Sequence, residues 1–239
     1  MKRKFWNWVR DQDTGERILR LNGPIAEQTW LGDEVTPAIF RDELNASDGD
    51  ITVWLNSPGG DVFAASQIYT MLMEYSGNVS VKIDGLAASA ASIVAMSGTT
   101  VEMSPVSMMM IHNPATIAIG DTEEMKAAIK MLDEVKEGII NAYALKTNLP
   151  HDKLANMMTA ETWMNAKKAV ELGFADGILY SDNGEETADT DSVYTEPVAF
   201  SRMAVTNSIL DKFKHNKLSA PDNRVSSEQL HKRLNLLAH

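Results

Sequence analysis

An alternation of strand-like and helix-like segments between residues 51 and 114 limits the folds open to this chain. The run ITVWLN at 51–56 mixes β-branched and aromatic residues, and VSVKID at 79–84, TTVEMS at 99–104 and VSMMMIHNP at 106–114 are further short runs. Between them, residues 61–77 place apolar side chains at helical spacing, and DGLAASAASIVAMSG at 84–98 favours a second helix rich in small residues. Short links between such elements predict right-handed crossovers and an α/β fold with a mainly parallel sheet.

A long amphipathic helix is expected over residues 120–147. Asp121 and Glu124 resemble an N-terminal capping pair. At about 1.5 Å per residue the helix would be roughly 38 Å long, which is long for one domain of this size. Either it protrudes into a partner subunit or it packs along the domain surface. Its apolar stripe consists of Met125, Ala128, Ile129, Leu132, Val135, Ile139 and Ala142.

Composition excludes several classes of protein. The chain has no cysteine, so disulfides and thiol catalysis are excluded, and no metal-ligand cluster or cofactor motif is visible. A net charge of −11 disfavours a nucleic-acid partner, because phosphate binding needs a basic surface. The basic N-terminus lacks an apolar run behind it, and no segment approaches the roughly 20 apolar residues of a membrane span. We therefore expect a soluble, cytoplasmic protein.

Charge divides the chain near residue 180. Residues 181–200 hold six acidic residues and no Lys or Arg, which is typical of a solvated linker. Residues 201–239 are net basic and contain two short segments that could form helices, neither long enough to be stable alone. The sequence thus predicts one domain over residues 1–180 and an acidic linker with a C-terminal tail over residues 181–239.

Three features fall at the ends of expected strands. SPGGD at 57–61 follows the first strand, Ser89 in GLAAS follows the second, and His112 ends the apolar run at 106–111. Each has an ordinary interpretation: a tight turn, a helix cap and a structural histidine. The other histidines lie in a polar turn (His151) or in the tail (His215, His231 and His239). Together at one edge of a parallel sheet, the three features favour a serine–histidine pair.

Four segments in order resemble the Clp-type serine proteases, the ClpP family: LNSPGGDVFAASQIY, IDGLAASAAS, MMMIHNP and WMNAKKAVELGFADGI. The resemblance covers roughly residues 17–180. It implies a ClpP/crotonase-like fold, a repeated β-β-α superhelix with a protruding helix. It also implies that Ser89 is the nucleophile, His112 the base, and the N–H groups of Gly60 and Ala90 the oxyanion hole. Ser92, one turn further on, is expected to be buried packing.

The third member of the triad departs from the family pattern. Glu161 in TAETWMNAKKA stands where the family usually has aspartate. A carboxylate of either length can orient an imidazole, so Glu161 is the first candidate. Asp176, Asp152 or no acid at all remain alternatives. The residue before Glu161 is Ala160. Housekeeping members make charged contacts between rings at this position, and alanine carries no charge, so the sequence does not predict a double-ring assembly.

The resemblance implies a serine endopeptidase that forms homo-oligomeric rings and acts on proteins or peptides. A short leader and an added tail resemble the phage and prophage proteases that process capsid or scaffold proteins during head maturation, in the host cytoplasm or the assembling head. One alternative is a housekeeping peptidase subunit that works with an ATP-driven unfoldase. Two others come from different classes: a crotonase-type acyl-CoA enzyme and a catalytically silent ring subunit.

Overall fold

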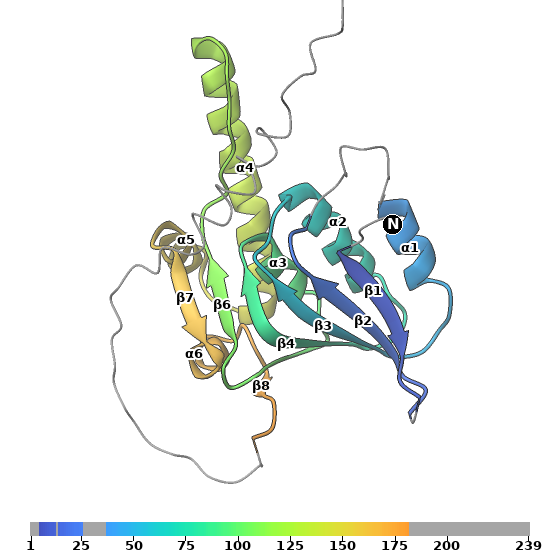
Figure 1. Cartoon of the computed structure of the whole chain (residues 1–239). Helices are drawn as coiled ribbons and strands as arrows, with labels where there is room; N and C mark the ends of the chain where they lie inside the picture. The colour runs from blue at the N-terminus through green and yellow to red at the C-terminus, as the bar shows by residue number, and fades with distance from the viewer. Residues whose placement is uncertain (1–4, 13, 26–36, 182–239) are drawn as a thin grey trace, which may run out of the picture. The chain divides into compact units, whose positions relative to one another are not determined.

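The computed structural model describes residues 5–12, 14–25 and 37–181. The acidic linker and tail lie outside the described residues, so the domain boundary near residue 180 stays a prediction. Strands and helices alternate along the described part (Figure 1). In chain order they are β1 (Trp6–Arg10), β2 (Arg17–Asn22), α1 (Pro37–Leu44), β3 (Ile51–Ser57), α2 (Val62–Met73), β4 (Val79–Ala88), α3 (Ala90–Ala95), β5 (Thr100–Met103), β6 (Met108–Ile111), α4 (Thr122–Thr147), α5 (His151–Thr159), β7 (Thr162–Asn165), α6 (Ala166–Glu171) and β8 (Gly177–Ile178).

The strands form one sheet that divides at β4. Its main path runs β1-β2-β3-β4-β5-β8, and β6 pairs with both β4 and β7. The first half of β4 pairs with β5 over 80–83, and its last residues pair with β6 over 86–88. Pairing is parallel throughout except at β1–β2 and β6–β7. The predicted α/β fold with a mainly parallel sheet is therefore confirmed.

The core lies between this sheet and the helices that connect its strands. Val53 on β3 and Val81 on β4 are fully buried, and they share the core with Ala65 and Leu72 of α2 and with Val94 of α3. Val79, Val81 and Ile83 alternate along β4, and Ala65 and Leu72 lie seven residues apart on α2, so both periodicities could be recognised in the sequence.

The segment after β4 differs from expectation. Residues 84–88 were expected to open a helix, but they continue β4, and α3 is only six residues long. The reason is tertiary pairing, because Leu86–Ala88 are held by β6. Gly85 also lies against a side chain: a Cβ atom there would be 2.7 Å from Asn56 Oδ1. The small residues of this stretch thus serve close strand packing as much as helix packing.

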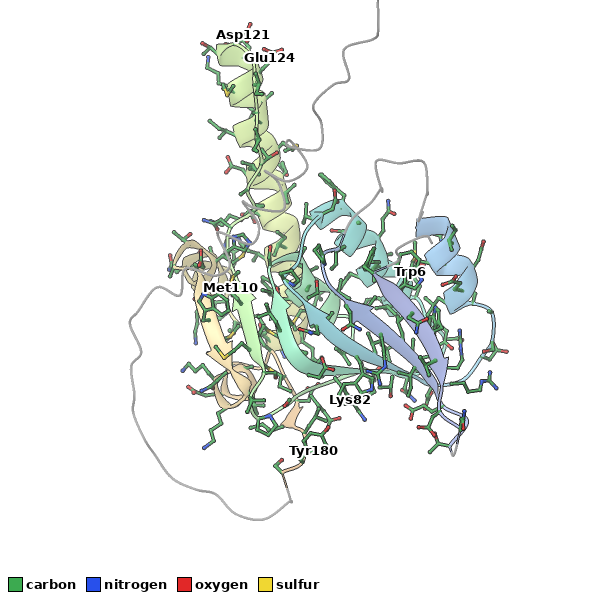
Figure 2. The ribbon with its side chains drawn as sticks, viewed as in Figure 1. Trp6, Lys82, Met110, Asp121, Glu124 and Tyr180 are labelled. Atoms are coloured by element: carbon green, nitrogen blue, oxygen red, sulfur yellow. The ribbon has the colours of Figure 1, made fainter. Side chains whose placement is uncertain are left out.

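The helix α4 projects from the body for about half of its length (Figure 1). The predicted capping box is present, with Asp121 accepting from the Glu124 N–H and Glu124 accepting from the Asp121 N–H. Figure 2 shows this pair at the far end of the helix. The buried residues all belong to its C-terminal part: Ile139, Ile140, Ala142, Tyr143 and Thr147. The expectation of a protruding helix is therefore confirmed for this chain.

None of the helices in the described part of the chain combines the length and the apolar character that a membrane span requires.

Candidate active site

Ser89 lies in a sharp turn between β4 and α3. Its backbone has φ 55° and ψ −128°, in a region that residues with a Cβ atom rarely adopt. Such a conformation costs about 1–3 kcal/mol and persists only where the surrounding structure enforces it. Here the Ser89 N–H donates to Met110 O at 2.9 Å, and the Ser89 carbonyl accepts from the Ser92 N–H at 2.9 Å. The strained turn places the half-buried Ser89 side chain directly after the carboxyl end of β4.

Gly59 allows the chain after β3 to pass directly beside Ser89. Gly59 has φ +90°, and a Cβ atom on it would lie 2.6 Å from Ala88 O and 2.7 Å from Ser89 Cβ. Gly60 is equally restricted, because a Cβ atom there would lie 2.1 Å from Ile25 O. The absence of a side chain at Gly59 therefore lets backbone lie directly against Ser89.

His112 is hydrogen-bonded to Ser89. The register Ala88–Met110 places the ends of β4 and β6 side by side, and each strand is followed closely by one of these residues. Figure 2 labels Met110 on β6, two residues before His112. His112 Nε2 lies 2.7 Å from Ser89 Oγ. When the hydroxyl donates this bond, Nε2 is the acceptor and the ring proton is on Nδ1. The serine–histidine pair expected from the sequence is thus brought together.

Glu161 and His112 lie at the same end of the β6–β7 pair. β6 and β7 are antiparallel and their last pair is Ile111–Thr162, so His112, directly after β6, and Glu161, directly before β7, adjoin that pair. Glu161 has φ 51°, which is uncommon for a residue with a Cβ atom, and its N–H donates to Met158 O at 3.1 Å. The Asn113 N–H donates to the same carbonyl at 3.2 Å, which ties the segments after β6 and before β7 together.

The alternative acids are occupied elsewhere. Asp176 Oδ2 accepts from the Val101 N–H at 2.7 Å and forms an ion pair with Lys146 Nζ at 2.7 Å. Val101 pairs with Val81 of β4, which lies eight residues before Ser89. Asp176, bonded to Val101, therefore lies near the start of β4, whereas Ser89 follows its end. Asp152 is almost fully exposed and contacts the neighbouring His151. The geometry therefore favours Glu161 over both aspartates as the carboxylate beside His112.

Gly60 comes shortly before α2, and Ala90 directly follows Ser89 in the chain. Ala90 is the first residue of α3, where backbone N–H groups have no partner inside the helix. Gly60 forms an isolated bridge with Ile25, in which Gly59 O and the Asp61 N–H make the hydrogen bonds. No described residue accepts from the N–H of Gly60 or Ala90. Both groups are consequently candidates to bind a developing oxyanion.

The family comparison adds to this geometry. The model of the Clp protease family matches residues 2–182 of the chain. The chain belongs to the Clp protease family. The match covers β1 to β8, and so includes the turn at Ser89, the end of β6 and the start of β7. Membership in the Clp protease family implies a serine-type peptidase in general, and it favours this activity over acyl-CoA chemistry.

One feature of the site was not foreseen from the sequence. Ser92 is fully buried, as expected, but it also contacts Tyr143 of α4, 51 positions further along the chain. The sequence does not predict this contact. Tyr143 lies among apolar residues of a helix, so its position indicates only that it is buried in the core. The described residues contain no cluster of three or more His, Cys, Asp or Glu that could hold a metal ion.

Proposed function

We propose that this chain is a serine endopeptidase with Ser89 as nucleophile, His112 as general base and Glu161 as the carboxylate that stabilises the charged imidazole. The observation that carries the proposal is the 2.7 Å hydrogen bond between Ser89 Oγ and His112 Nε2 on a strained turn. A hydroxyl with an adjacent base is the arrangement that activates serine for acyl transfer.

The steps follow from this arrangement. His112 Nε2 takes the hydroxyl proton as Ser89 Oγ attacks the peptide carbonyl, and the N–H groups of Gly60 and Ala90 bind the resulting oxyanion. His112 then gives the proton to the leaving amine, which leaves an acyl ester on Ser89. Water then attacks the ester carbonyl while the same imidazole takes its proton. The bond between the acyl carbon and Ser89 Oγ breaks, the second product leaves as an acid, and His112 returns the proton to Ser89 Oγ. Glu161 offsets the positive charge on His112 during both transfers.

The test is covalent labelling with a fluorophosphonate, which reacts with activated serines. We expect one adduct, located on Ser89 by peptide mass spectrometry, and loss of both labelling and peptide hydrolysis in Ser89→Ala. Ser97→Ala is a matched control, because Ser97 is a buried serine at the other end of α3. Unlabelled wild-type protein that also fails to hydrolyse peptides would support a catalytically silent subunit instead.

Self-assembly into a homo-oligomeric ring is part of the proposal. The outer part of α4 carries exposed apolar side chains on one face, among them Met125 at 36% and Ile129 at 59% exposure. Apolar groups in a row on a helix are ordinarily covered by a partner. A second copy of the chain is the partner that the Clp protease family suggests.

For the biological role we propose processing of capsid or scaffold proteins during phage head maturation. The chain continues past the family match, with an acidic segment and a basic tail that are candidates for contact with an assembling head. This role predicts cleavage of a loosely folded protein such as casein without nucleotide or unfoldase. Hydrolysis of short peptides alone, with proteins cut only when an ATP-driven unfoldase is added, would instead favour the housekeeping role.

A further inference from the structure

A chain of buried hydroxyl groups connects α4 to the backbone of Ser89. Tyr143 OH lies 2.8 Å from Ser92 Oγ, and Ser92 Oγ lies 2.5 Å from Ser89 O. Ser92 is 0% and Tyr143 is 1% exposed, so water does not compete for these bonds. None of the proton transfers proposed above involves either hydroxyl. Their connection to the nucleophile therefore calls for a different role.

The hydrogen bonds between these hydroxyl groups all have the same donor-to-acceptor direction. A carbonyl oxygen can only accept, so the single hydroxyl proton of Ser92 points to Ser89 O. Ser92 Oγ must then accept in its contact with Tyr143, which makes Tyr143 the donor. Burial raises the pKa of Tyr143 well above its ordinary value, so its hydroxyl keeps the proton it donates. The direction is thus from α4, through Ser92, to the carbonyl of Ser89.

The Ser89 carbonyl shares a peptide group with the Ala90 N–H. A peptide group is planar and its trans C=O and N–H point in opposite directions, so fixing the oxygen also fixes the direction of the N–H. Ser89 O accepts twice, from the Ser92 N–H and from Ser92 Oγ. Hydrogen bonds in a chain also polarise one another, so these two donors make the Ala90 N–H a stronger donor.

We propose that Tyr143 and Ser92 are positioning residues that orient and polarise the Ala90 N–H toward the oxyanion. The inference rests on the proposed function, and it gives α4 a direct influence on catalysis through Tyr143. Because an oxyanion forms only in the transition state, the two hydroxyls act on kcat and leave substrate binding unchanged. A merely structural pair of hydroxyls would affect the stability of the fold and not kcat.

The test compares Tyr143→Phe, Ser92→Ala and the double variant, with Ser97→Ala as control. Ser97 Oγ donates to Val94 O at 2.6 Å just after α3 ends, so the control removes a similar serine–carbonyl bond away from Ser89. We expect Ser92→Ala to lower kcat about tenfold at constant KM, a fraction of the roughly 10²–10³-fold that loss of a whole oxyanion donor costs. Tyr143→Phe lowers kcat less, and Ser97→Ala leaves it unchanged.

Two readouts separate positioning from a structural effect. The inhibition constant of a peptide boronate, which forms a tetrahedral adduct with serine, is expected to rise in proportion to the fall in kcat. Ser92→Ala leaves the Tyr143 hydroxyl buried without its acceptor, whereas the double variant removes both groups. The double variant should therefore recover thermal stability while its kcat stays as low as that of Ser92→Ala.

Recovery of kcat together with stability in the double variant would overturn the inference. Unchanged kcat and boronate inhibition in a folded Ser92→Ala or Tyr143→Phe would do the same, with the proposed function left standing. A wild-type protein that neither hydrolyses peptides nor labels at Ser89 would instead overturn the proposed function and this inference with it.

Discussion

The proposed nucleophile and base were identified from short motifs because each lies directly at a strand end. GLAAS and MIH place Ser89 and His112 after neighbouring parallel strands, whose carboxyl ends meet at one edge of a sheet. The conformation of Ser89 was not predictable in this way, since its positive φ depends on contacts from β6 and from Gly59. Local sequence thus indicated which residues meet, and tertiary contacts determine how they are held.

Removing the base is expected to cost more activity than neutralising the acid. His112→Ala should lower kcat by about 10⁶-fold, and Glu161→Gln by about 10⁴-fold or less, because the acid acts only through the histidine. Steady-state hydrolysis of a fluorogenic peptide measures both losses. Asp176→Asn is the matched control: it breaks the ion pair with Lys146 and is expected to lower the melting temperature while kcat stays near that of wild type. Full activity in Glu161→Gln would remove Glu161 from the mechanism.

Gly59→Ala should abolish activity through the backbone alone. The added methyl group would lie 2.8 Å from Ala90 N as well as against Ser89 Cβ, and φ +90° is unfavourable for alanine. We expect loss of fluorophosphonate labelling and a lower melting temperature. Gly138→Ala is the control, because a Cβ atom at that helical position meets nothing within 4 Å. Labelling of Gly59→Ala at the wild-type rate would show that the turn after β3 is not needed beside Ser89.

At the scale of elements, the sequence pattern predicted β3 to β6, α2 and α4, but it gave no prediction for β7 and β8. β3, α2 and α4 carry enough residues to show their repeat. β7 and β8 have four and two residues, too few to show alternation, and they form because β6 and β5 are available as partners. The extension of β4 to Ala88 was not predicted either, because it depends on pairing with β6, which overrides the helical preference of alanine.

The contact between α4 and α5 is expected to depend on pH. His151 Nε2 lies 2.8 Å from Glu137 of α4, and the hydrogen bond to Glu137, followed by that to Asp152, raises the pKa of His151 above its usual value. A raised pKa in the folded state means a stabilisation that is complete below the unfolded value and is lost as the pH rises through the folded one. His151→Gln should therefore lower the melting temperature more at pH 5.5 than at pH 9. An equal decrease at both pH values would contradict this assignment.

At the scale of the whole molecule, the outer part of α4 is expected to decide assembly. Ile129→Asp places a charge in the exposed apolar stripe and should convert an oligomer to a smaller species, with peptide hydrolysis reduced in parallel. Light scattering coupled to size exclusion measures the mass. Val106→Asp is the control, because Val106 is also exposed, at 85%, but lies in the turn before β6. A monomeric and fully active wild-type protein would contradict the assembly.

The division of the sheet at β4 has a consequence for how the enzyme loses activity. Ser89 follows a strand that belongs to both parts of the sheet, whereas His112 and Glu161 are carried by β6 and β7 alone. In the described sheet, three ladder pairs join β6 to β4: Leu86–Met108, Ala87–Met109 and Ala88–Met110. Breaking these pairs would separate the proposed base and acid from the proposed nucleophile, while the pairing of β1 to β5 could persist. We therefore expect activity to be lost by local opening before the whole domain unfolds.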